Sequence, residues 1–383
     1  MTSFQYLFLA QEVIFGPGSL GNLKNIVDRY GWKRLMICTT PSMLSRQEFA
    51  AFCENLSDRL AVVYGTVRPH VLEAQLSEAL ELAKKKGVDA VIGMGGGSPI
   101  GMAKAISHTL EQETQEIGRS SLPTDQPRVP VIAVPTTYAG SEMTPVYGVT
   151  RLQNGVIRKV TVKDAKVTPK VTLYDPELTL TLPPSITAGT GMNAVAHCIE
   201  ALYSISKNPL STAAAYHGLQ LISRSLVRCV KAGDDLEART EMMQGAFLAG
   251  GALSNVAMGL HHGICHVLGG TTGISHGDAN SVMLPHVIRF NLDTAPHELA
   301  MAAEAIGVKR DGSSPEAAAI AAADQLEQWA QEMGMPRRLR ELGVGNNQLP
   351  ELAELAYKNQ TVHNNPKKIT DKEQLLELLE LAW

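Results

Sequence analysis

The sequence has little of three things that would each indicate a specialised class of protein: paired cysteines, long apolar runs and an excess of one charge. Its five cysteines lie far apart without a C-x-x-C pair, so we expect reduced, mostly buried thiols. The net charge of −4 is spread over mixed signs with no basic stripe, which argues against a nucleic-acid partner. No stretch reaches the roughly eighteen apolar residues of a membrane span, and the opening MTSFQYLFLAQEVIFG lacks a basic region and a cleavage site. These absences predict a soluble, cytoplasmic protein that binds neither nucleic acid nor a membrane.

The 383 residues suffice for two domains, and the texture of the sequence changes once. Amphipathic stretches with helical spacing alternate with apolar runs that predict strands, at 33–40, 60–67, 89–95 and 129–137. This alternation predicts a parallel, Rossmann-like sheet. After about residue 185 only helical patterns follow. We therefore expect an α/β nucleotide-binding domain (1–185) and an all-helical domain (186–383), with the active site in the cleft between them.

One segment, 146–162, interrupts the alternation. Asn154-Gly155 stands between two β-rich runs and predicts a hairpin, because both turn positions require positive φ. There is no internal repeat and no low-complexity tract.

A glycine run marks the first candidate binding loop. Residues 89–107, DAVIGMGGGSPIGMAKAIS, predict a strand, a loop and a helix. Backbone amides at a helix N-terminus, exposed by glycines, bind phosphate well, so Gly95, Gly96, Gly97 and Ser98 are candidates for holding a pyrophosphate. The run departs from G-x-G-x-x-G, and a tight strand-to-helix turn would also use glycines.

A second polar loop, PTTYAGSEMTPVY (135–147), follows the next strand. Hydroxyls of Thr136, Thr137 and Ser141 stand where strands of an open parallel sheet meet a ligand, although capping and turn formation use the same residue types. Two such loops on consecutive strands favour a nucleotide crevice. The predicted cofactor-binding residues are Thr40, Gly95, Gly96, Gly97, Ser98, Thr136, Thr137, Ser141, Tyr147 and Lys159.

Histidines gather in GLHHGICHVLGGTTGISHG (259–277). His262 and His266 are four apart and share a face of the predicted helix, His261 points about a quarter-turn away, and His276 follows in a turn. Upstream, TGMNAVAHCIEALYS places Asn193 and His197 on one helix face. A single histidine is more often a satisfied polar residue than a ligand, but several at this spacing favour a functional cluster.

These stretches together resemble the iron-containing alcohol dehydrogenase superfamily and, within it, the maleylacetate reductases. The resemblance runs from VIFGPGSL to the closing NNPKKITDKEQLLELLELAW and is most specific in PTTYAGSEMTP, YDPELTLTLP, GMNAVAHCIEALYS and HHGICHVLGG. It implies the dehydroquinate synthase-like architecture, an α/β N-terminal domain followed by an all-α C-terminal domain. It also implies an NAD(P)H-dependent oxidoreductase and a homodimer.

The resemblance raises the question of whether this protein binds a metal ion. In metal-dependent relatives an Asp and three His hold the ion, and these positions correspond here to Asn193, His197, His262 and His276, with His266 as a nearby catalytic histidine. An amide is a poorer ligand for a divalent cation than a carboxylate, yet three neutral imidazoles can still bind zinc. The similar reductases carry the same Asn and are regarded as metal-independent. The resemblance therefore implies a vestigial metal site at Asn193, His197, His262 and His276. These four residues and His266 keep catalytic roles without a required metal.

The implied substrate is a small dicarboxylate, maleylacetate, in which a C=C is conjugated to a ketone. Hydride addition to the alkene carbon distal to the ketone leaves a delocalised enolate, which imidazole donors stabilise without a cation before protonation completes 3-oxoadipate. Metal-dependent relatives often end an early strand with an acid that excludes a 2′-phosphate, whereas here the strand ends with Thr39 and Thr40. We therefore expect both NADH and NADPH to serve.

Three alternatives remain open. One is a metal-dependent alcohol dehydrogenase or aldehyde reductase on the same fold, with Asn193 as a weak ligand. Another is a lyase like dehydroquinate synthase, which needs a Lys/Arg-rich substrate pocket where this sequence offers chiefly histidines. The last is a non-catalytic nucleotide-binding protein, which leaves the histidines unexplained.

Overall fold

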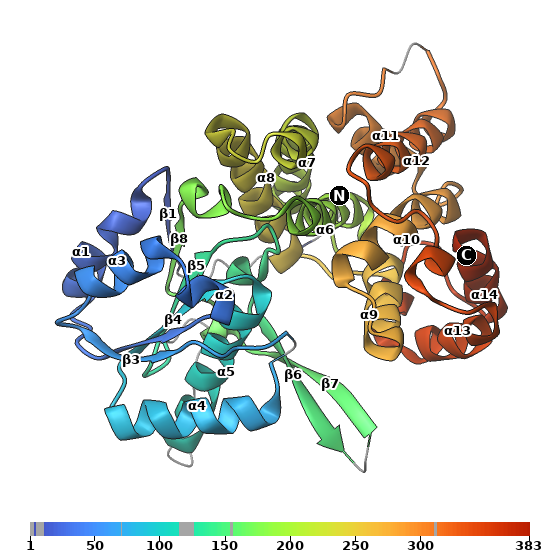
Figure 1. Cartoon of the computed structure of the whole chain (residues 1–383). Helices are drawn as coiled ribbons and strands as arrows, with labels where there is room; N and C mark the ends of the chain where they lie inside the picture. The colour runs from blue at the N-terminus through green and yellow to red at the C-terminus, as the bar shows by residue number, and fades with distance from the viewer. Residues whose placement is uncertain (1–3, 5–10, 70, 115–125, 154–155, 310–311) are drawn as a thin grey trace. The chain divides into compact units, whose positions relative to one another are not determined.

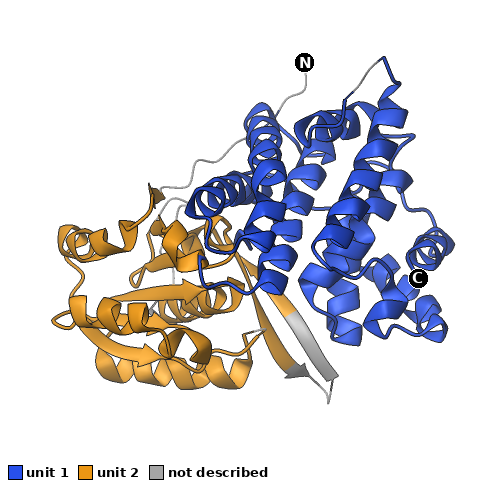
Figure 2. Ribbon diagram, turned by 45° about the horizontal axis from the view of Figure 1, so that its top comes forward, with its two compact units in different colours: residues 1–6, 138–140, 180–383 blue, residues 7–137, 141–179 orange. Residues whose placement is uncertain are grey.

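The chain forms two compact units in the computed structural model, which describes residues 4, 11–69, 71–114, 126–153, 156–309 and 312–383 (Figure 2). The α/β unit comprises residues 7–137 and 141–179. The helical unit comprises residues 180–383 together with 1–6 and the short segment 138–140. The three residues Tyr138–Gly140 thus belong to the helical unit, although Thr137 before them and Ser141 after them belong to the α/β unit.

The α/β unit is built on a six-stranded sheet with the order β1-β8-β5-β4-β2-β3 (Figure 1). The strands are β1 Glu12–Phe15, β2 Leu35–Cys38, β3 Leu60–Tyr64, β4 Ala90–Gly95, β5 Val131–Pro135 and β8 Val171–Tyr174. Every pairing in this sheet is parallel. The predicted parallel, Rossmann-like sheet is confirmed, whereas β1 and β8 have no counterpart among the four predicted strands.

Helices cover both faces of this sheet, and the strand sequences explain why. In β2, Leu35 and Ile37 belong to the core shared with α1 (Leu23–Tyr30) and α3 (Gln47–Asn55). Met36 and Cys38 belong to the opposite core, shared with α4 (Glu73–Lys86) and α5 (Gly97–Thr114). Since successive side chains of a strand point to opposite faces, a strand covered on both sides reads as the continuous apolar run LMIC.

The predicted hairpin is a second, two-stranded sheet. β6 (Val146–Gln153) pairs antiparallel with β7 (Val156–Lys163), with Gln153 opposite Val156. The dipeptide Asn154-Gly155, from which the hairpin was predicted, lies outside the described residues.

From residue 180 onward the described chain forms helices and turns and no strands, which confirms the predicted all-α C-terminal part. The helices are α6 Pro184–Tyr203, α7 Pro209–Lys231, α8 Leu236–Ser254, α9 Leu260–Thr272, α10 His276–Phe290, α11 Pro296–Ala305, α12 Pro315–Glu332, α13 Leu349–Lys358 and α14 Glu373–Ala382, with short 3₁₀ turns between some of them. Helix α6 is buried over nearly its whole length. A separate apolar core joins α9, α10, α13 and α14. Within the described residues, no helix combines the length and the apolar character needed to cross a membrane.

Candidate active site

Three neighbouring strands bring the predicted phosphate-binding residues to one edge of the sheet. β2, β4 and β5 are adjacent and parallel, so their carboxyl ends coincide. The Thr39 hydroxyl donates to the carbonyl of Met94 at 2.8 Å, and the amide of Thr136 donates to the carbonyl of Gly95 at 3.0 Å. The residues after β2, β4 and β5 therefore form one continuous edge.

Glycine is required in the loop after β4. Gly95 has φ +141°, a conformation that side-chain-bearing residues rarely adopt. A Cβ on Gly93 would lie 2.7 Å from the Cα of Ile100, so this glycine lets α5 pack closely against β4. A Cβ on Gly96 would lie 3.3 Å from Thr137. Helix α5 begins at Gly97, and its first amides are thereby available to a phosphate at the sheet edge.

The other predicted cofactor residues lie in different surroundings. Thr40 is the N-cap residue of the short helix α2 (Pro41–Leu44), and its hydroxyl lies 2.9 Å from that of Ser42. Tyr147, on β6, is buried, with its hydroxyl 2.7 Å from Nδ1 of His108. Burial raises the pKa of Tyr147 to about 12. Lys159 lies on β7 opposite Thr150. The structure therefore brings together the two loops, and the cofactor roles of all ten residues remain predictions.

A buried lysine, not predicted to be functional, supports the second loop. Lys104 of α5 is fully buried, and its ammonium donates to the carbonyls of Ser141, Thr144 and Val146 at 2.5, 2.7 and 3.1 Å. Burial lowers the pKa of Lys104 to about 7, although the charge of Glu142 raises it. Lys104 stands in AKAIS, seven residues after Gly97, at an ordinary helix position, so no pattern in the sequence indicates this role.

In the helical unit, four predicted histidines form a row of contacting rings. His197 of α6 stacks on His262 of α9, with ring centroids 4.8 Å apart and planes 13° apart. The His262 ring lies 6.0 Å from that of His276, at the start of α10. His276 in turn stacks on His266 at 5.4 Å. We call these four rings the histidine row. It begins at two buried rings, passes half-buried His276 and ends at exposed His266.

The buried end of the histidine row holds a neutral His197 ring and has ring nitrogens without a partner among the described residues. Burial, reinforced by the neighbouring histidines, holds the pKa of His197 well below its usual range. Nδ1 of His197 and Nε2 of His262 are buried without a hydrogen-bond partner in the part of the chain that the structure describes. A buried polar atom without a partner costs about 1–3 kcal/mol, so a ligand oxygen placed there is favoured.

Asn193 is fixed by two hydrogen bonds. Its Oδ1 accepts from Nδ2 of Asn280 at 2.8 Å, and its own Nδ2 donates to the carbonyl of Ala139 at 3.3 Å. Oδ1 of Asn280 lies 2.9 Å from Nε2 of His261, which is therefore the nitrogen that carries the proton. His261, which the helical spacing turned away from the cluster, is fully buried in this network, and burial lowers its pKa to about 4.

Glu200 orients His262 and was missed by the sequence reasoning. This fully buried carboxylate accepts the Nδ1 proton of His262, and its other oxygen accepts from the amides of Gly259 and His261. Although burial raises the pKa of Glu200, the charges of His262 and these hydrogen bonds bring it below its usual value. Glu200 follows His197 by three residues on α6, a spacing that could have identified it.

The implied metal site is Asn193, His197, His262 and His276, and its residues are not arranged to hold an ion in the part of the chain that the structure describes. His197 and His262 lie as nearly parallel rings with their centroids 4.8 Å apart. The only oxygen of the Asn193 side chain already accepts from Asn280. Within the described residues, no group of three or more His, Cys, Asp or Glu side chains is arranged to hold a metal ion. Three neutral imidazoles and an amide whose oxygen is already used are a weaker donor set for a divalent cation than one that includes a carboxylate.

Comparisons with known proteins agree with this architecture. Residues 10–176 match the family model for iron-containing alcohol dehydrogenase, and residues 187–383 match the C-terminal model of the Fe-containing alcohol dehydrogenase family. The chain is 34% identical to maleylacetate reductase of Pseudomonas knackmussii, over all of this chain and 98% of that protein. The crystal structure of maleylacetate reductase from Agrobacterium tumefaciens aligns with a TM-score of 0.85 at 33% identity, covering 100% and 99% of the two chains. The crystal structure of a 1,3-propanediol oxidoreductase aligns with a TM-score of 0.91 at 30% identity, covering 100% of both chains. The chain belongs to the iron-containing alcohol dehydrogenase family of oxidoreductases.

Proposed function

We propose that this protein reduces maleylacetate to 3-oxoadipate with NADH or NADPH and needs no metal ion. The observation that carries the proposal is the histidine row, whose buried end offers unpartnered ring nitrogens while the oxygen of Asn193 is already used. Relatives named maleylacetate reductase, about a third identical over the whole chain, support the choice of substrate.

The cofactor has a suitable cradle in the α/β unit. The amides at the start of α5, Gly96 and the hydroxyls of Thr136 and Thr137 suit a pyrophosphate. A bound nicotinamide supplies the hydride. Lys104 holds the loop that carries Ser141, so this part of the cradle is rigid before the cofactor arrives.

The histidine row then provides the remaining chemistry. Hydride added to the alkene carbon distal to the ketone places negative charge on the ketone oxygen, as an enolate. Two groups at the buried end can donate hydrogen bonds to this oxygen: an N–H of the neutral His197 ring and Nε2 of His262 when it holds a proton. Hydrogen bonds are stronger there because water is excluded and the local dielectric constant is low. Glu200 stabilises the charge that His262 gains when its Nε2 holds a proton.

His276 and His266 complete the reaction. His266 is exposed and stacks on His276, so it exchanges protons with water and passes one inward to the enolate carbon. One hydride and one proton convert maleylacetate to 3-oxoadipate, and no metal is needed because the enolate charge is delocalised and met by imidazoles.

The deciding test is an NADH-oxidation assay with maleylacetate, with simple aldehydes and glycerol-type alcohols as controls. The proposal expects maleylacetate to be reduced, with 3-oxoadipate as product, at least about a hundredfold more efficiently in kcat/KM than any aldehyde. Faster turnover of aldehydes that depends on added iron or zinc would instead support a metal-dependent alcohol dehydrogenase.

We further propose that the enzyme acts as a homodimer in the cytoplasm. Free thiols at all five cysteines and the need for reduced cofactor support this location. The resemblance to dimeric relatives supports the oligomeric state. Light scattering on the purified protein tests the dimer: a mass of one chain would contradict it.

A further inference from the structure

Arg239 of α8 is a fully buried guanidinium surrounded by uncharged oxygens. Its Nε donates to the carbonyl of Gly233 at 3.0 Å, and its Nη2 donates to the carbonyl of Leu182 at 3.3 Å. Its Nη1 donates to two hydroxyls, those of Tyr138 at 3.1 Å and Thr187 at 2.9 Å. Burying a charge is costly unless its donors are satisfied, so these four bonds hold separate segments of the helical unit tightly together.

One of these segments touches the histidine row. Tyr138 opens the segment Tyr138–Gly140, which belongs to the helical unit although the chain on both sides of it belongs to the α/β unit. The next carbonyl, of Ala139, accepts from Nδ2 of Asn193. Gly140, with φ +78°, lies against His197: a Cβ added there would fall 3.5 Å from both Cε1 and Nδ1 of that ring.

We infer that Arg239 is a positioning residue for the reaction, acting through Tyr138 on Asn193 and His197. The planar guanidinium fixes the position of the Tyr138 hydroxyl through a hydrogen bond. Because Ala139 and Gly140 follow directly in the chain, the position of Tyr138 also determines where these two residues contact the Asn193 amide and the His197 ring. The inference rests on the proposed function for its kinetic readout, but its structural readout is independent of substrate.

Two substitutions separate positioning from simple stabilisation. Tyr138→Phe and Thr187→Val each remove one acceptor of the same Nη1 atom, and both side chains are fully buried. Both variants should therefore lose thermal stability to a similar extent. Tyr138 is followed directly by Ala139 and Gly140, which contact Asn193 and His197, whereas Thr187 lies in the first turn of α6, more than one helical turn before Asn193. Tyr138→Phe should therefore lower kcat by about tenfold, with the KM for NADH within twofold of wild type. Thr187→Val should keep kcat within twofold.

The substrate-independent readout is the Cε1–H NMR signal of His197 in histidine-labelled protein, assigned by its loss in His197→Gln. Tyr138→Phe should shift this signal and Thr187→Val should leave it in place. Gly140→Ala, which leaves all four Arg239 bonds intact, should shift it as well and lower kcat, and it replaces Tyr138→Phe if that variant does not fold. Equal kcat in the Tyr138 and Thr187 variants, or an unmoved His197 signal in both Tyr138→Phe and Gly140→Ala, overturns the inference. A wild-type protein inactive on maleylacetate instead contradicts the proposed function and leaves the NMR comparison valid.

Discussion

In the α/β unit, the groups available to a phosphate lie at the sheet edge formed by the residues after β2, β4 and β5. They are backbone amides and the hydroxyls of serine and threonine. In the helical unit, the groups available for chemistry are imidazoles from α6, α9 and α10 and the amide of Asn193. Glu200 holds the His262 ring, and Asn280 and the carbonyl of Ala139 hold the Asn193 amide. The first region depends on the path of the main chain, and the second depends on side chains far apart in sequence. Substitutions should therefore affect cofactor binding through backbone strain and the chemical step through single lost groups.

The largest effect is expected in the histidine row. His266→Ala removes the exposed proton donor and should lower kcat by about a hundredfold or more, with the KM for NADH nearly unchanged. Single-turnover kinetics and melting temperature on the same variant separate loss of chemistry from loss of stability.

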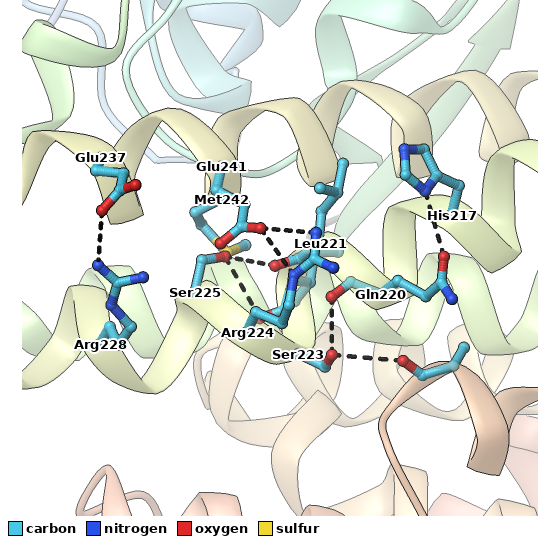
Figure 3. A network of polar contacts seen from close by, with 12 residues as sticks. His217, Gln220, Leu221, Ser223, Arg224, Ser225, Arg228, Glu237, Glu241 and Met242 are labelled. Atoms are coloured by element: carbon cyan, nitrogen blue, oxygen red, sulfur yellow. Dashed lines mark hydrogen bonds and ion pairs between the residues drawn. The ribbon is translucent and has the colours of Figure 1, made fainter.

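His217 provides the matched control for this variant. It is an exposed histidine of α7 whose Nδ1 lies 3.3 Å from Oε1 of Gln220, within a surface network between α7 and α8 (Figure 3). His217→Ala should keep wild-type kcat. A His266→Ala variant that turns over like His217→Ala would show that the proton comes from elsewhere.

These two regions also differ in how far the sequence alone predicts them. The strand, glycine and helix pattern of 89–107 is local, so the sequence predicts β4, the loop and the helix after it, although α5 continues to Thr114. Helical spacing likewise placed His262 and His266 on one face. It could not predict that Asn280, 87 residues after Asn193, fixes that amide, or that His261 is buried behind the row. Such partners follow from helix packing, which leaves no signature in local periodicity.

The next effect is expected at the glycine loop. Gly95→Ala forces a side chain into φ +141° and against Pro99, whose Cγ would lie 2.8 Å from the new Cβ. Strain of about 1–3 kcal/mol in this conformation should weaken NADH binding by about tenfold or more. At saturating NADH, kcat should recover.

Gly251, inside α8, is the control for this substitution, because a Cβ there meets no atom within 4 Å. Gly251→Ala should leave the dissociation constant for NADH unchanged and raise the melting temperature slightly. Fluorescence titration measures both variants. Unchanged NADH binding by Gly95→Ala would remove the glycine loop from the cofactor site.

A smaller effect is expected on cofactor choice. With Thr39 and Thr40 after β2, wild-type kcat/KM for NADH and NADPH should agree within about tenfold, or 1.4 kcal/mol. Thr40→Asp keeps a good N-cap for α2 and adds a charge that repels a 2′-phosphate, so it should lower kcat/KM for NADPH by about a further tenfold. Steady-state kinetics with both cofactors test this. If Thr40→Asp lowered kcat/KM for NADH as much as for NADPH, the substitution would be affecting cofactor binding in general and not the 2′-phosphate.

The smallest effect is expected for a surface ion pair of the helical unit. Lys372 and Lys358, each 2.9 Å from Glu354, lower the pKa of that carboxyl to about 2. Because the pKa is lower in the folded state, the stabilisation is complete above the unfolded value of 4.5 and is lost as the pH falls toward 2. Glu354→Gln should lower the melting temperature only slightly at pH 7, since the pair is exposed, and the difference should shrink below pH 4.5. Thermal scans across pH measure it, and a difference that grows on acidification would reverse the assigned sign.

The central claim is that imidazoles, without a metal ion, carry the chemical step. The most direct measurement is the rate of maleylacetate reduction before and after exhaustive chelation, with the metal content of both samples determined. The account predicts an unchanged rate in protein that holds less than about one metal ion per ten chains. A rate abolished by chelation and restored by iron or zinc would contradict it.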